Sequence, residues 1–362
     1  MNIRPELWQR PAREVAVAGS THFRLAPTVR DGVLASGVSL IEQPLRNDTG
    51  VTPEVSRADV LITGMAVIDD AVASQLRNVR LVLRPYVGYD DIDVDALTAQ
   101  GILFANVPDA FIEEVANQTL ALILACNRKI VPTDAFVKRG EWSGGARNRT
   151  ASIPIRRLSQ LTLGLVGFGN IGRLVAERAR PFGFRMLAAD PYMAPEVVRS
   201  FGVEPAPLER VMAESDIVSV HVLLNRETRH LIGAPQLALM KPEAVLINTS
   251  RGPIVDEAAL VAALRAGSLA GAGLDVFEVE PIPADSPLLG MPNVVLSAHI
   301  ASYSEEGDVA HNLRTLDILS RVVAGGLPER KVVVNKDLYD ALAAELGATE
   351  RSPSADRSPA RR

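Results

Sequence analysis

Short apolar runs alternate with helical patterns along the first third of this chain. Five runs have the length of strands, and they lie at 15–18, 38–41, 59–63, 79–83 and 102–105. Apolar residues at helical spacing lie between some of them, at 67–76 and 94–99. Because strands that alternate with helices pair in parallel, this pattern predicts a parallel sheet covered by helices on both faces.

A second block of the same kind runs from about residue 158 to residue 300. Its expected strands lie at 163–166, 186–189, 217–221, 244–248, 271–275 and 294–297. Helical patterns separate most of these strands. Six parallel strands joined by helices are the strand count of a dinucleotide-binding fold.

Two long helical patterns, 113–138 and 305–324, flank the second block. Pro132 would kink or break the first one. The second has the length to return the chain to the first block. We therefore expect two domains, a discontinuous one at 13–112 and 304–340 and a continuous one at 113–303. The last residues, 348–362, are rich in Ser, Pro, Arg and Ala, a composition typical of a disordered tail.

Composition and charge narrow the class of protein. A chain of 362 residues with 47% hydrophobic residues can form two buried cores. The net charge of −5 argues against a nucleic-acid-binding surface. We find no apolar run that could span a membrane, no signal peptide and no metal-binding pattern, so we expect a cytoplasmic protein. The single cysteine, Cys126, lies in an apolar stretch and is interpreted as buried and inert.

The segment L-T-L-G-L-V-G-F-G-N-I-G, residues 161–172, carries the most chemical information. An apolar strand runs into a glycine-rich turn, and a helical pattern follows at 173–180. Gly167 permits the tight turn, Gly169 allows close approach of a pyrophosphate, and Gly172 allows the helix to pack on the strand. Phosphate would bind the free N–H groups at the helix N-terminus. The segment predicts a dinucleotide site.

Asp190 supports this interpretation and indicates which dinucleotide is bound. It follows the next expected strand, where a carboxylate can accept hydrogen bonds from a ribose diol. No Arg or Lys comes directly after it in Asp190-Pro191-Tyr192 to bind a 2′-phosphate. We therefore expect NAD to be preferred over NADP.

Three residues with reactive or charged side chains follow the last three expected strands. They are Arg251, Glu280 and His299. Singly, each has a plain interpretation, as a solvated loop residue, a surface acid and a strand cap. Together they lie at the carboxyl ends of strands, where open parallel sheets bind ligands. Arginine can bind a carboxylate through two hydrogen bonds, histidine can exchange the proton that accompanies hydride transfer, and a neighbouring glutamate stabilises the imidazolium.

Four motifs extend this pattern: G-F-G-N-I-G, I-N-T-S-R-G-P-I-V-D-E-A-A-L, G-A-G-L-D-V-F-E-V-E-P and S-A-H-I-A-S. With them the chain resembles the D-isomer-specific 2-hydroxyacid dehydrogenase family over roughly residues 15–338. It is most similar to the C-terminal-binding-protein-like and phosphoglycerate-dehydrogenase-like branches. The resemblance implies an α/β protein of two lobes, a Rossmann-type NAD-binding domain and a flavodoxin-like substrate domain. It also implies a homodimer formed through the NAD-binding domain.

The resemblance also implies roles for individual residues. Arg251 would bind the substrate carboxylate together with the N–H groups of Val87 and Gly88, His299 would be the acid and base, and Glu280 its partner. The implied cofactor-binding residues are Thr119, Gly167, Gly169, Asn170, Ile171, Gly172, Asp190, Val222, Asn225, Thr228, Thr249, Ser250, Asp275 and Ser302.

At a few positions the chain departs from the family pattern. Tyr86 stands where relatives usually have glycine, and Asp90-Asp91 stands in place of D-N. Ala298 replaces the proline that commonly precedes the histidine. Ser302 replaces an aromatic residue of the animal C-terminal-binding proteins, so their preference for a thioether side chain is not transferred to this chain.

The function that we expect is NAD-dependent interconversion of a 2-keto acid and a D-2-hydroxy acid. Two alternatives stay open from the sequence. One is an NAD(H)-sensing interaction protein similar to the corepressor relatives. The other is oxidation of a small anion such as phosphite or formate. The identity of the acid does not follow from the residues.

Overall fold

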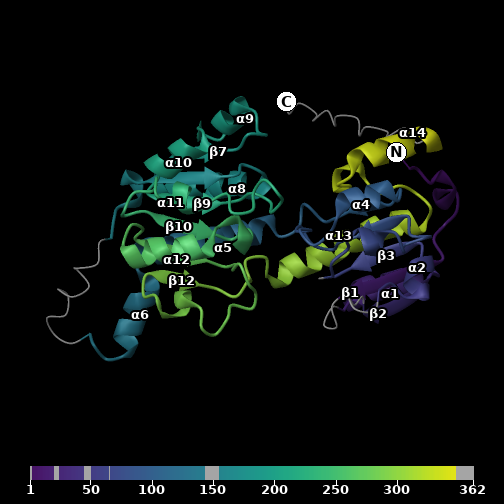
Figure 1. Cartoon of the computed structure of the whole chain (residues 1–362), viewed down its shortest axis with the longest axis horizontal. Helices are drawn as coiled ribbons and strands as arrows, with labels where there is room; N and C mark the ends of the chain where they lie inside the picture. The colour runs from purple at the N-terminus through teal and green to yellow at the C-terminus, as the bar shows by residue number, and fades with distance from the viewer. Residues whose placement is uncertain (1, 20–23, 45–49, 65, 143–154, 348–362) are drawn as a thin grey trace, which may run out of the picture. The chain divides into compact units, whose positions relative to one another are not determined.

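The computed structural model describes residues 2–19, 24–44, 50–64, 66–142 and 155–347, so the predicted tail lies outside the described residues. The chain divides into two compact units. The first is formed by Met1–Ala110 with Asp308–Arg362, and the second by Phe111–Gly307 (Figure 1). Each unit is built on one parallel sheet, as the alternation of apolar runs and helical patterns predicts.

The first unit contains a five-stranded parallel sheet in the order β2-β1-β3-β4-β5. Its strands are β1 (Glu14–Gly19), β2 (Ser39–Pro44), β3 (Val60–Thr63), β4 (Leu81–Leu83) and β5 (Leu103–Ala105). This order is that of a flavodoxin-like sheet, and the predicted fold class is confirmed. Its helices are α1 (Pro27–Ala35), α2 (Pro53–Arg57), α3 (Asp70–Ala73), α4 (Val94–Ala99), most of α13 (Glu305–Val323), from Asp308 onward, and α14 (Lys336–Leu346).

The helix expected at 67–76 is shorter than predicted. Ile68 forms a parallel bridge with Ile92, so the backbone there is extended. The helix begins only after Asp69, whose carboxylate accepts a hydrogen bond from the Val72 N–H and caps the first turn. A tertiary contact therefore overrides the helical pattern at its start.

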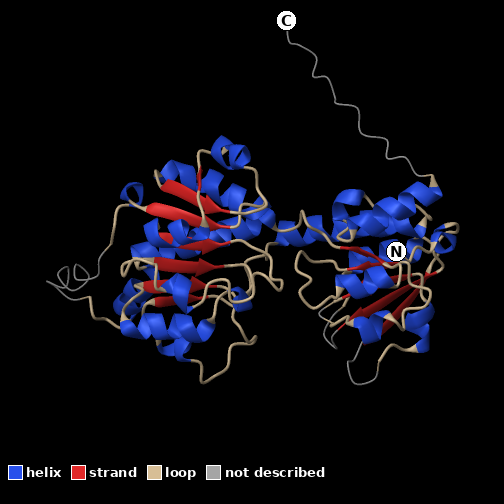
Figure 2. Cartoon of the chain, turned by 45° about the horizontal axis from the view of Figure 1, so that its top comes forward, coloured by secondary structure: helices blue, strands red, loops and turns tan. Residues whose placement is uncertain are grey.

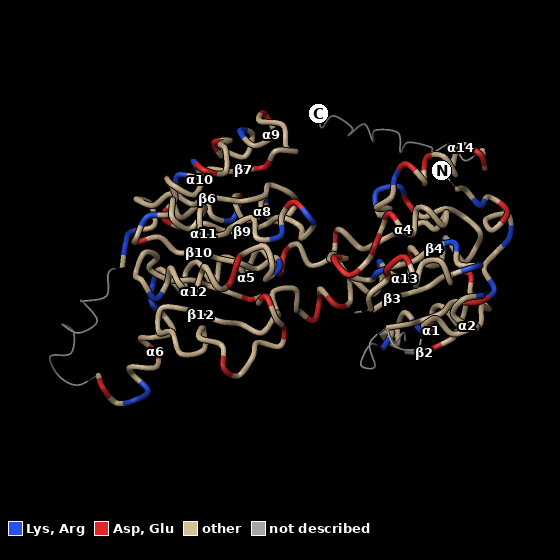
Figure 3. Tube along the Cα trace, in the orientation of Figure 1, with Lys and Arg blue, Asp and Glu red and all other residues tan. Residues whose placement is uncertain are grey.

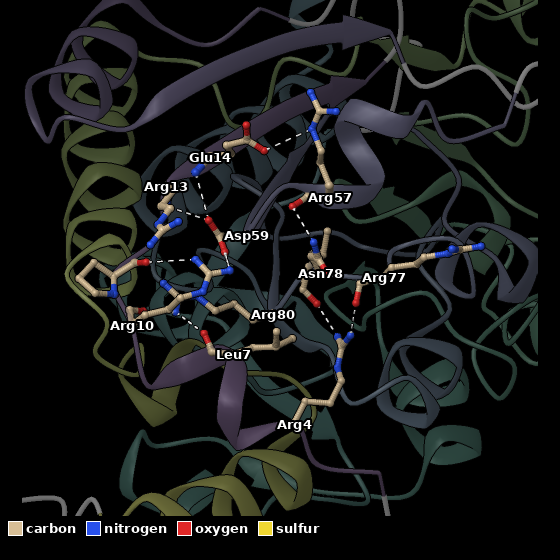
Figure 4. A network of polar contacts seen from close by, with 12 residues as sticks. Arg4, Leu7, Arg10, Arg13, Glu14, Arg57, Asp59, Arg77, Asn78 and Arg80 are labelled. Atoms are coloured by element: carbon tan, nitrogen blue, oxygen red, sulfur yellow. Dashed lines mark hydrogen bonds and ion pairs between the residues drawn. The ribbon is translucent and has the colours of Figure 1, made fainter.

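Buried charges fix the N-terminal segment at the amino ends of β3 and β4. The Arg80 guanidinium is fully buried and donates to the carbonyl oxygens of Leu7 at 2.6 Å and Arg10 at 2.7 Å (Figure 4). Beside it, Asp59 forms an ion pair of 2.7 Å with Arg10 and accepts from the Arg13 and Glu14 N–H groups. These contacts lie at the amino ends of the strands, opposite the carboxyl end of β4, from which the chain runs on to Val87 and Gly88.

The second unit contains a seven-stranded parallel sheet in the order β12-β11-β10-β9-β6-β7-β8. Its strands are β6 (Thr162–Val166), β7 (Arg185–Ala189), β8 (Glu204–Pro205), β9 (Ile217–Val220), β10 (Val245–Asn248), β11 (Gly271–Leu274) and β12 (Val294–Leu296). The prediction of six strands was wrong by one. The additional strand, β8, has two residues and no apolar run, and it exists only as a pairing partner for β7.

The helices of this unit cover both faces of its sheet (Figure 2). They are α5 (Ile112–Arg128), α6 (Ile130–Lys138), α8 (Asn170–Ala179), α9 (Pro195–Ser200), α10 (Leu208–Glu214), α11 (Ala234–Leu237) and α12 (Glu257–Ala266). Consecutive residues of β10, Leu246 and Ile247, are buried in different hydrophobic clusters. Because strand side chains alternate between faces, one cluster lies on each side of the sheet.

The pattern at 113–138 forms two helices rather than one. They meet at Lys129, which has a left-handed backbone with φ of 57°. In a continuous helix the Pro132 ring would collide with the carbonyl of Arg128. The chain instead begins α6 at Ile130, which places the proline in the first turn of the new helix. Within α5, Cys126 is buried, and burial raises its pKa to about 12.

Candidate active site

The carboxyl ends of the parallel strands in the second unit carry nearly all the predicted site residues. Loops at this edge follow β6, β7, β9, β10, β11 and β12. Residues from separate parts of the sequence therefore reach the same edge of one sheet. Val87 and Gly88 belong to the first unit, and the structure describes them within that unit.

The glycine turn after β6 has the conformation that the motif requires. Gly167 has φ of 96°, and a Cβ atom there would lie 2.7 Å from the backbone carbon of His221. A Cβ atom at Gly172 would lie 2.5 Å from the Gly167 oxygen. At Gly169 a Cβ atom would meet nothing within 4 Å. The outer two glycines are required by packing, and the middle one leaves space at the start of α8.

The N-terminus of α8 is suited to bind an anion. Gly169 occupies the N-cap position, where it has no side chain to satisfy the first N–H groups. Asn170 and Ile171 form the first turn. Free N–H groups and the positive end of a helix dipole favour a phosphate at this position. The residues therefore fit the pyrophosphate of a dinucleotide.

Asp190 follows β7, and its carboxylate is held from two sides. Oδ2 accepts from the Phe168 N–H at 2.8 Å, and Oδ1 accepts from the Tyr192 N–H at 2.9 Å. The first bond connects Asp190 to the glycine turn. Each oxygen retains a lone pair, so the carboxylate can still accept hydrogen bonds from a ribose diol.

The loop after β9 contains three predicted cofactor-binding residues. Asn225 Oδ1 accepts from the Thr228 N–H at 3.0 Å, and Thr228 Oγ1 accepts from the Asn225 N–H at 2.8 Å. These reciprocal bonds fix the shape of the loop. Val222 lies beside the glycine turn, since one of its methyl groups would be 2.9 Å from a Cβ atom at Gly167.

The turn after β10 brings Thr119 and Thr249 together. Their hydroxyl oxygens are 2.8 Å apart, and both side chains are buried. Thr119 donates to the Val115 carbonyl, so Thr249 is the donor between the two hydroxyls. Ser250 donates to the Val220 carbonyl at 2.8 Å. The turn after β10 is thus bound to α5 through Thr119 and to the end of β9 through the Val220 carbonyl.

Asn248, at the end of β10, was not predicted as a site residue. Its Oδ1 accepts from the Ser250 N–H at 3.0 Å, and its Nδ2 donates to the Arg251 carbonyl at 2.9 Å. Both bonds shape the turn that presents the Arg251 side chain. The turn packs tightly behind this side chain, because a Cβ atom at Gly252 would lie only 1.8 Å from the Phe277 oxygen.

Glu280 and His299 form a hydrogen-bonded pair. His299 Nδ1 lies 2.6 Å from Glu280 Oε2, and the Phe277 N–H donates to Glu280 Oε1 at 2.9 Å. Burial raises the pKa of the Glu280 carboxyl, but the hydrogen bonds from His299 and Phe277 and the charge of Arg251 outweigh it and lower this pKa. Glu280 is therefore ionised at neutral pH, and its charge faces the imidazole.

Asp275 organises the loop that carries His299. Its buried carboxylate accepts from the Ser297 hydroxyl at 2.5 Å and from the Ala301 N–H at 2.8 Å. Its carbonyl oxygen accepts from the His299 N–H at 2.8 Å. These bonds hold His299 at φ of 53°, a left-handed conformation that is uncommon for a histidine. Ser302, half-buried, follows on the same loop.

A second histidine–glutamate pair escaped the sequence analysis. His230 Nε2 lies 2.6 Å from Glu278 Oε1, and the His230 N–H donates to the Pro253 carbonyl at 2.8 Å. These two hydrogen bonds therefore connect the loops after β9, β10 and β11. No motif marked it, because its two residues are brought together only by the order of the strands.

Acidic and basic residues are interspersed along the trace of both units (Figure 3). In the described part of the chain, no three His, Cys, Asp or Glu side chains are arranged to hold a metal ion. None of the helices formed by the described residues has the length and apolar character needed to cross a membrane.

Comparisons with known proteins agree on one family. A family model described as the NAD binding domain of D-isomer specific 2-hydroxyacid dehydrogenase matches residues 120–301. The glyoxylate reductase of Thermococcus litoralis is 38% identical over 307 residues, which are 83% of this chain and 91% of that protein. The match therefore extends well beyond the glycine motif.

Solved structures agree in fold over both units. A glyoxylate reductase from Paecilomyes thermophila has a TM-score of 0.79 at 30% identity, covering 90% of this chain and 99% of that one. A D-lactate dehydrogenase from Aquifex aeolicus, solved with NAD and lactic acid, has a TM-score of 0.78 at 28% identity, covering 88% and 98%.

Proposed function

Since this chain belongs to the D-isomer specific 2-hydroxyacid dehydrogenase family, we propose that it reduces a small 2-keto acid to the D-2-hydroxy acid with NADH. Membership makes it a nicotinamide-dependent oxidoreductase that acts on the CH–OH group of hydroxy acids. The choice of acid, the acid–base residue and the preference for NAD over NADP are parts of our proposal.

The observation that carries the proposal is the Glu280–His299 pair with the charge of Arg251 close to it. Reduction of a 2-keto acid needs a cation for the carboxylate and an acid for the carbonyl oxygen. Arg251 is proposed to bind the carboxylate, and His299 to give its Nε2 proton to the carbonyl oxygen. Glu280, bound to Nδ1, orients the ring and stabilises the imidazolium.

In this proposal the glycine turn, the N-terminus of α8 and Asp190 hold the dinucleotide. Thr119, Thr249 and Ser250 border its nicotinamide end, and bound NADH supplies the hydride. The negative charge of Asp190 disfavours the 2′-phosphate of NADP. Asp275 stays a predicted cofactor residue, although its carboxylate already accepts bonds within the His299 loop.

We assign NAD binding to the predicted domain at 113–303. The predicted domain at 13–112 and 304–340 would provide a second contact with the substrate carboxylate, in addition to that of Arg251. Val87 and Gly88 of the latter would donate their N–H groups to the substrate. Because two of the three compared relatives are named glyoxylate reductases, glyoxylate is the first substrate to test.

The test is turnover by the purified full chain. NADH oxidation would be followed with glyoxylate, hydroxypyruvate, pyruvate and larger 2-keto acids, and NAD reduction with phosphite and formate. We expect turnover with a 2-keto acid and production of the D-isomer. Turnover only with phosphite or formate would show that the alternative, oxidation of a small anion, is the correct function. Binding of NADH without turnover of any of these compounds would favour the NAD(H)-sensing alternative.

We also propose a homodimer formed through the NAD-binding domain. Helix α6 has no buried residue in the single chain and exposes Ile130, Val131 and Val137, and Trp142 beyond it is 70% exposed. A second copy would cover this apolar surface. Light scattering on the purified protein measures the mass, and Val137→Glu should shift it toward the monomer. A cytoplasmic location stays a prediction.

A further inference from the structure

The turn at 84–91 in the first unit is held by an ion pair between its two ends and by two side chains that come from outside it. At its start and end, Arg84 Nη2 lies 2.6 Å from Asp91 Oδ1, with the guanidinium almost fully buried. Two carbonyl groups of the turn are bound by these outside side chains, that of Pro85 by a residue of α13 and that of Val87 by the residue directly after β5. These two contacts determine the direction of the peptide groups between them.

Asn106, directly after β5, binds the Val87 carbonyl. Its Nδ2 donates to this oxygen at 2.8 Å, and only 5% of the residue is exposed. In a trans peptide the C=O and the following N–H point in opposite directions. Because the Val87 carbonyl points toward Asn106, the Gly88 N–H of the same peptide group points away from it.

His311, on α13, binds the turn one peptide group earlier. Its Nε2 forms a hydrogen bond with the Pro85 carbonyl, and its ring stacks on Tyr86 with centroids 5.6 Å apart and an angle of 15°. Burial lowers the pKa of His311, although the bond to Pro85 and the charge of Asp308 oppose this. A carbonyl only accepts, so Nε2 must carry the proton. The bond fixes the peptide group that joins Pro85 to Tyr86.

The N–H groups of Val87 and Gly88 have no hydrogen-bond acceptor among the described residues. Both residues are half-buried rather than fully solvated. Two adjacent N–H groups without acceptors, on a backbone fixed on both sides, form a site suited to an anion such as a carboxylate.

We propose that Asn106 and His311 are positioning residues for the substrate carboxylate. They fix the peptide groups on either side of the one between Tyr86 and Val87, so the Val87 and Gly88 N–H groups are directed before substrate binds. This inference rests on the proposed reduction of a 2-keto acid. Tyr86, where relatives usually have glycine, supplies the ring on which His311 stacks.

The decisive variants are Asn106→Ala, which removes the donor, and Asn106→Asp, which keeps the shape but places a carboxylate beside the Val87 carbonyl. We expect each to raise KM for the 2-keto acid at least about tenfold, with kcat within about threefold. The Kd of oxamate, an unreactive analogue, for the NADH complex should rise by a similar factor. The Kd of NADH itself should not change.

His311 is tested by separating its two contacts. His311→Gln keeps an N–H donor for the Pro85 carbonyl, and His311→Phe keeps a ring that stacks on Tyr86. We expect His311→Phe to raise KM for the 2-keto acid about tenfold. His311→Gln, which keeps the donor, should leave KM much closer to that of the native chain. Ser320→Ala, on the exposed side of the same helix, is the matched control and should leave KM unchanged.

The outcomes separate this inference from the proposed function. If the native chain reduces no 2-keto acid, the proposed function fails and with it the premise of the inference. If the native chain is active and the Asn106 variants bind NADH normally with unchanged KM and oxamate affinity, the inference alone is overturned. A loss of kcat and thermal stability without a change in KM would show a merely structural role and would also overturn it.

Discussion

His299 Nδ1 and Glu280 Oε2 lie 2.6 Å apart, although nineteen positions separate the two residues in the chain. Because Nδ1 is bound to Glu280, Nε2 is the ring atom that the proposed reaction assigns to proton exchange with the substrate. Because the pKa of Glu280 is lowered, the carboxylate keeps its charge throughout the neutral range. The pair therefore provides an oriented imidazole next to a permanent negative charge.

The first prediction concerns this pair and the pH profile. Reduction needs the imidazolium and oxidation the neutral imidazole, so reductive kcat/KM should fall at high pH and oxidative kcat/KM at low pH. Glu280→Gln removes the charge that stabilises the imidazolium and should move the reductive fall to lower pH. His299→Ala should lower kcat/KM at least about a hundredfold. An unchanged pH profile in Glu280→Gln would contradict the proposed action of Glu280 on His299. A fully active His299→Ala would overturn the proposed mechanism.

The second prediction concerns Asp190. Its carboxylate is fixed by the N–H groups of Phe168 and Tyr192, so it cannot easily move aside for a 2′-phosphate. We expect kcat/KM to favour NADH over NADPH by at least about tenfold, roughly 1.4 kcal/mol. Asp190→Asn keeps the shape without the charge and should reduce this preference. Steady-state kinetics with both cofactors measure it, and equal efficiency in the native chain would contradict the assignment.

The third prediction concerns Arg251, whose Nη1 donates to the Ser250 carbonyl at 2.8 Å. Lysine keeps the positive charge but loses the planar group that binds a carboxylate through two hydrogen bonds. Arg251→Lys should therefore lower kcat/KM for the 2-keto acid substantially, while the Kd of NADH in a fluorescence titration stays close to that of the native chain. An unchanged kcat/KM would contradict the proposal that Arg251 binds the substrate carboxylate.

The fourth prediction concerns stability and His221. Both of its ring nitrogens are inaccessible and have no hydrogen-bond partner among the described residues. Burial lowers the pKa of this imidazole to about 4. In the unfolded chain it titrates at about pH 6.5, so between these values only the unfolded chain binds the proton. The free energy of unfolding should therefore fall as the pH drops from about 6.5 to about 4, by on the order of 1–3 kcal/mol from this residue.

Urea unfolding of the native chain and of His221→Leu across this pH range checks the effect. Other titrating groups contribute to both proteins equally, so the difference between the two slopes belongs to His221. The variant should show the smaller loss of stability on acidification. Parallel curves for the two proteins would contradict the prediction.

Local signals in the sequence determined the two sheets, the glycine turn with Asp190, and the positions of Arg251, Glu280 and His299 after strands. Apolar runs reveal strands because burial requires them, and parallel pairing brings the strand ends to one edge. The short strand β8 and the extended backbone at Ile68, where a helix was expected, left no such signal. Each depends on a pairing partner elsewhere in the chain.

The tertiary structure alone decided which side chains support the predicted residues. His311 and Pro85 are separated by 226 positions, and His230 and Glu278 by 48. Asn106 faces the Val87 carbonyl only because the turn after β4 folds back over the end of β5. A single hydrogen bond between distant residues imposes no periodicity on the sequence, so such contacts become visible only once the chain is folded.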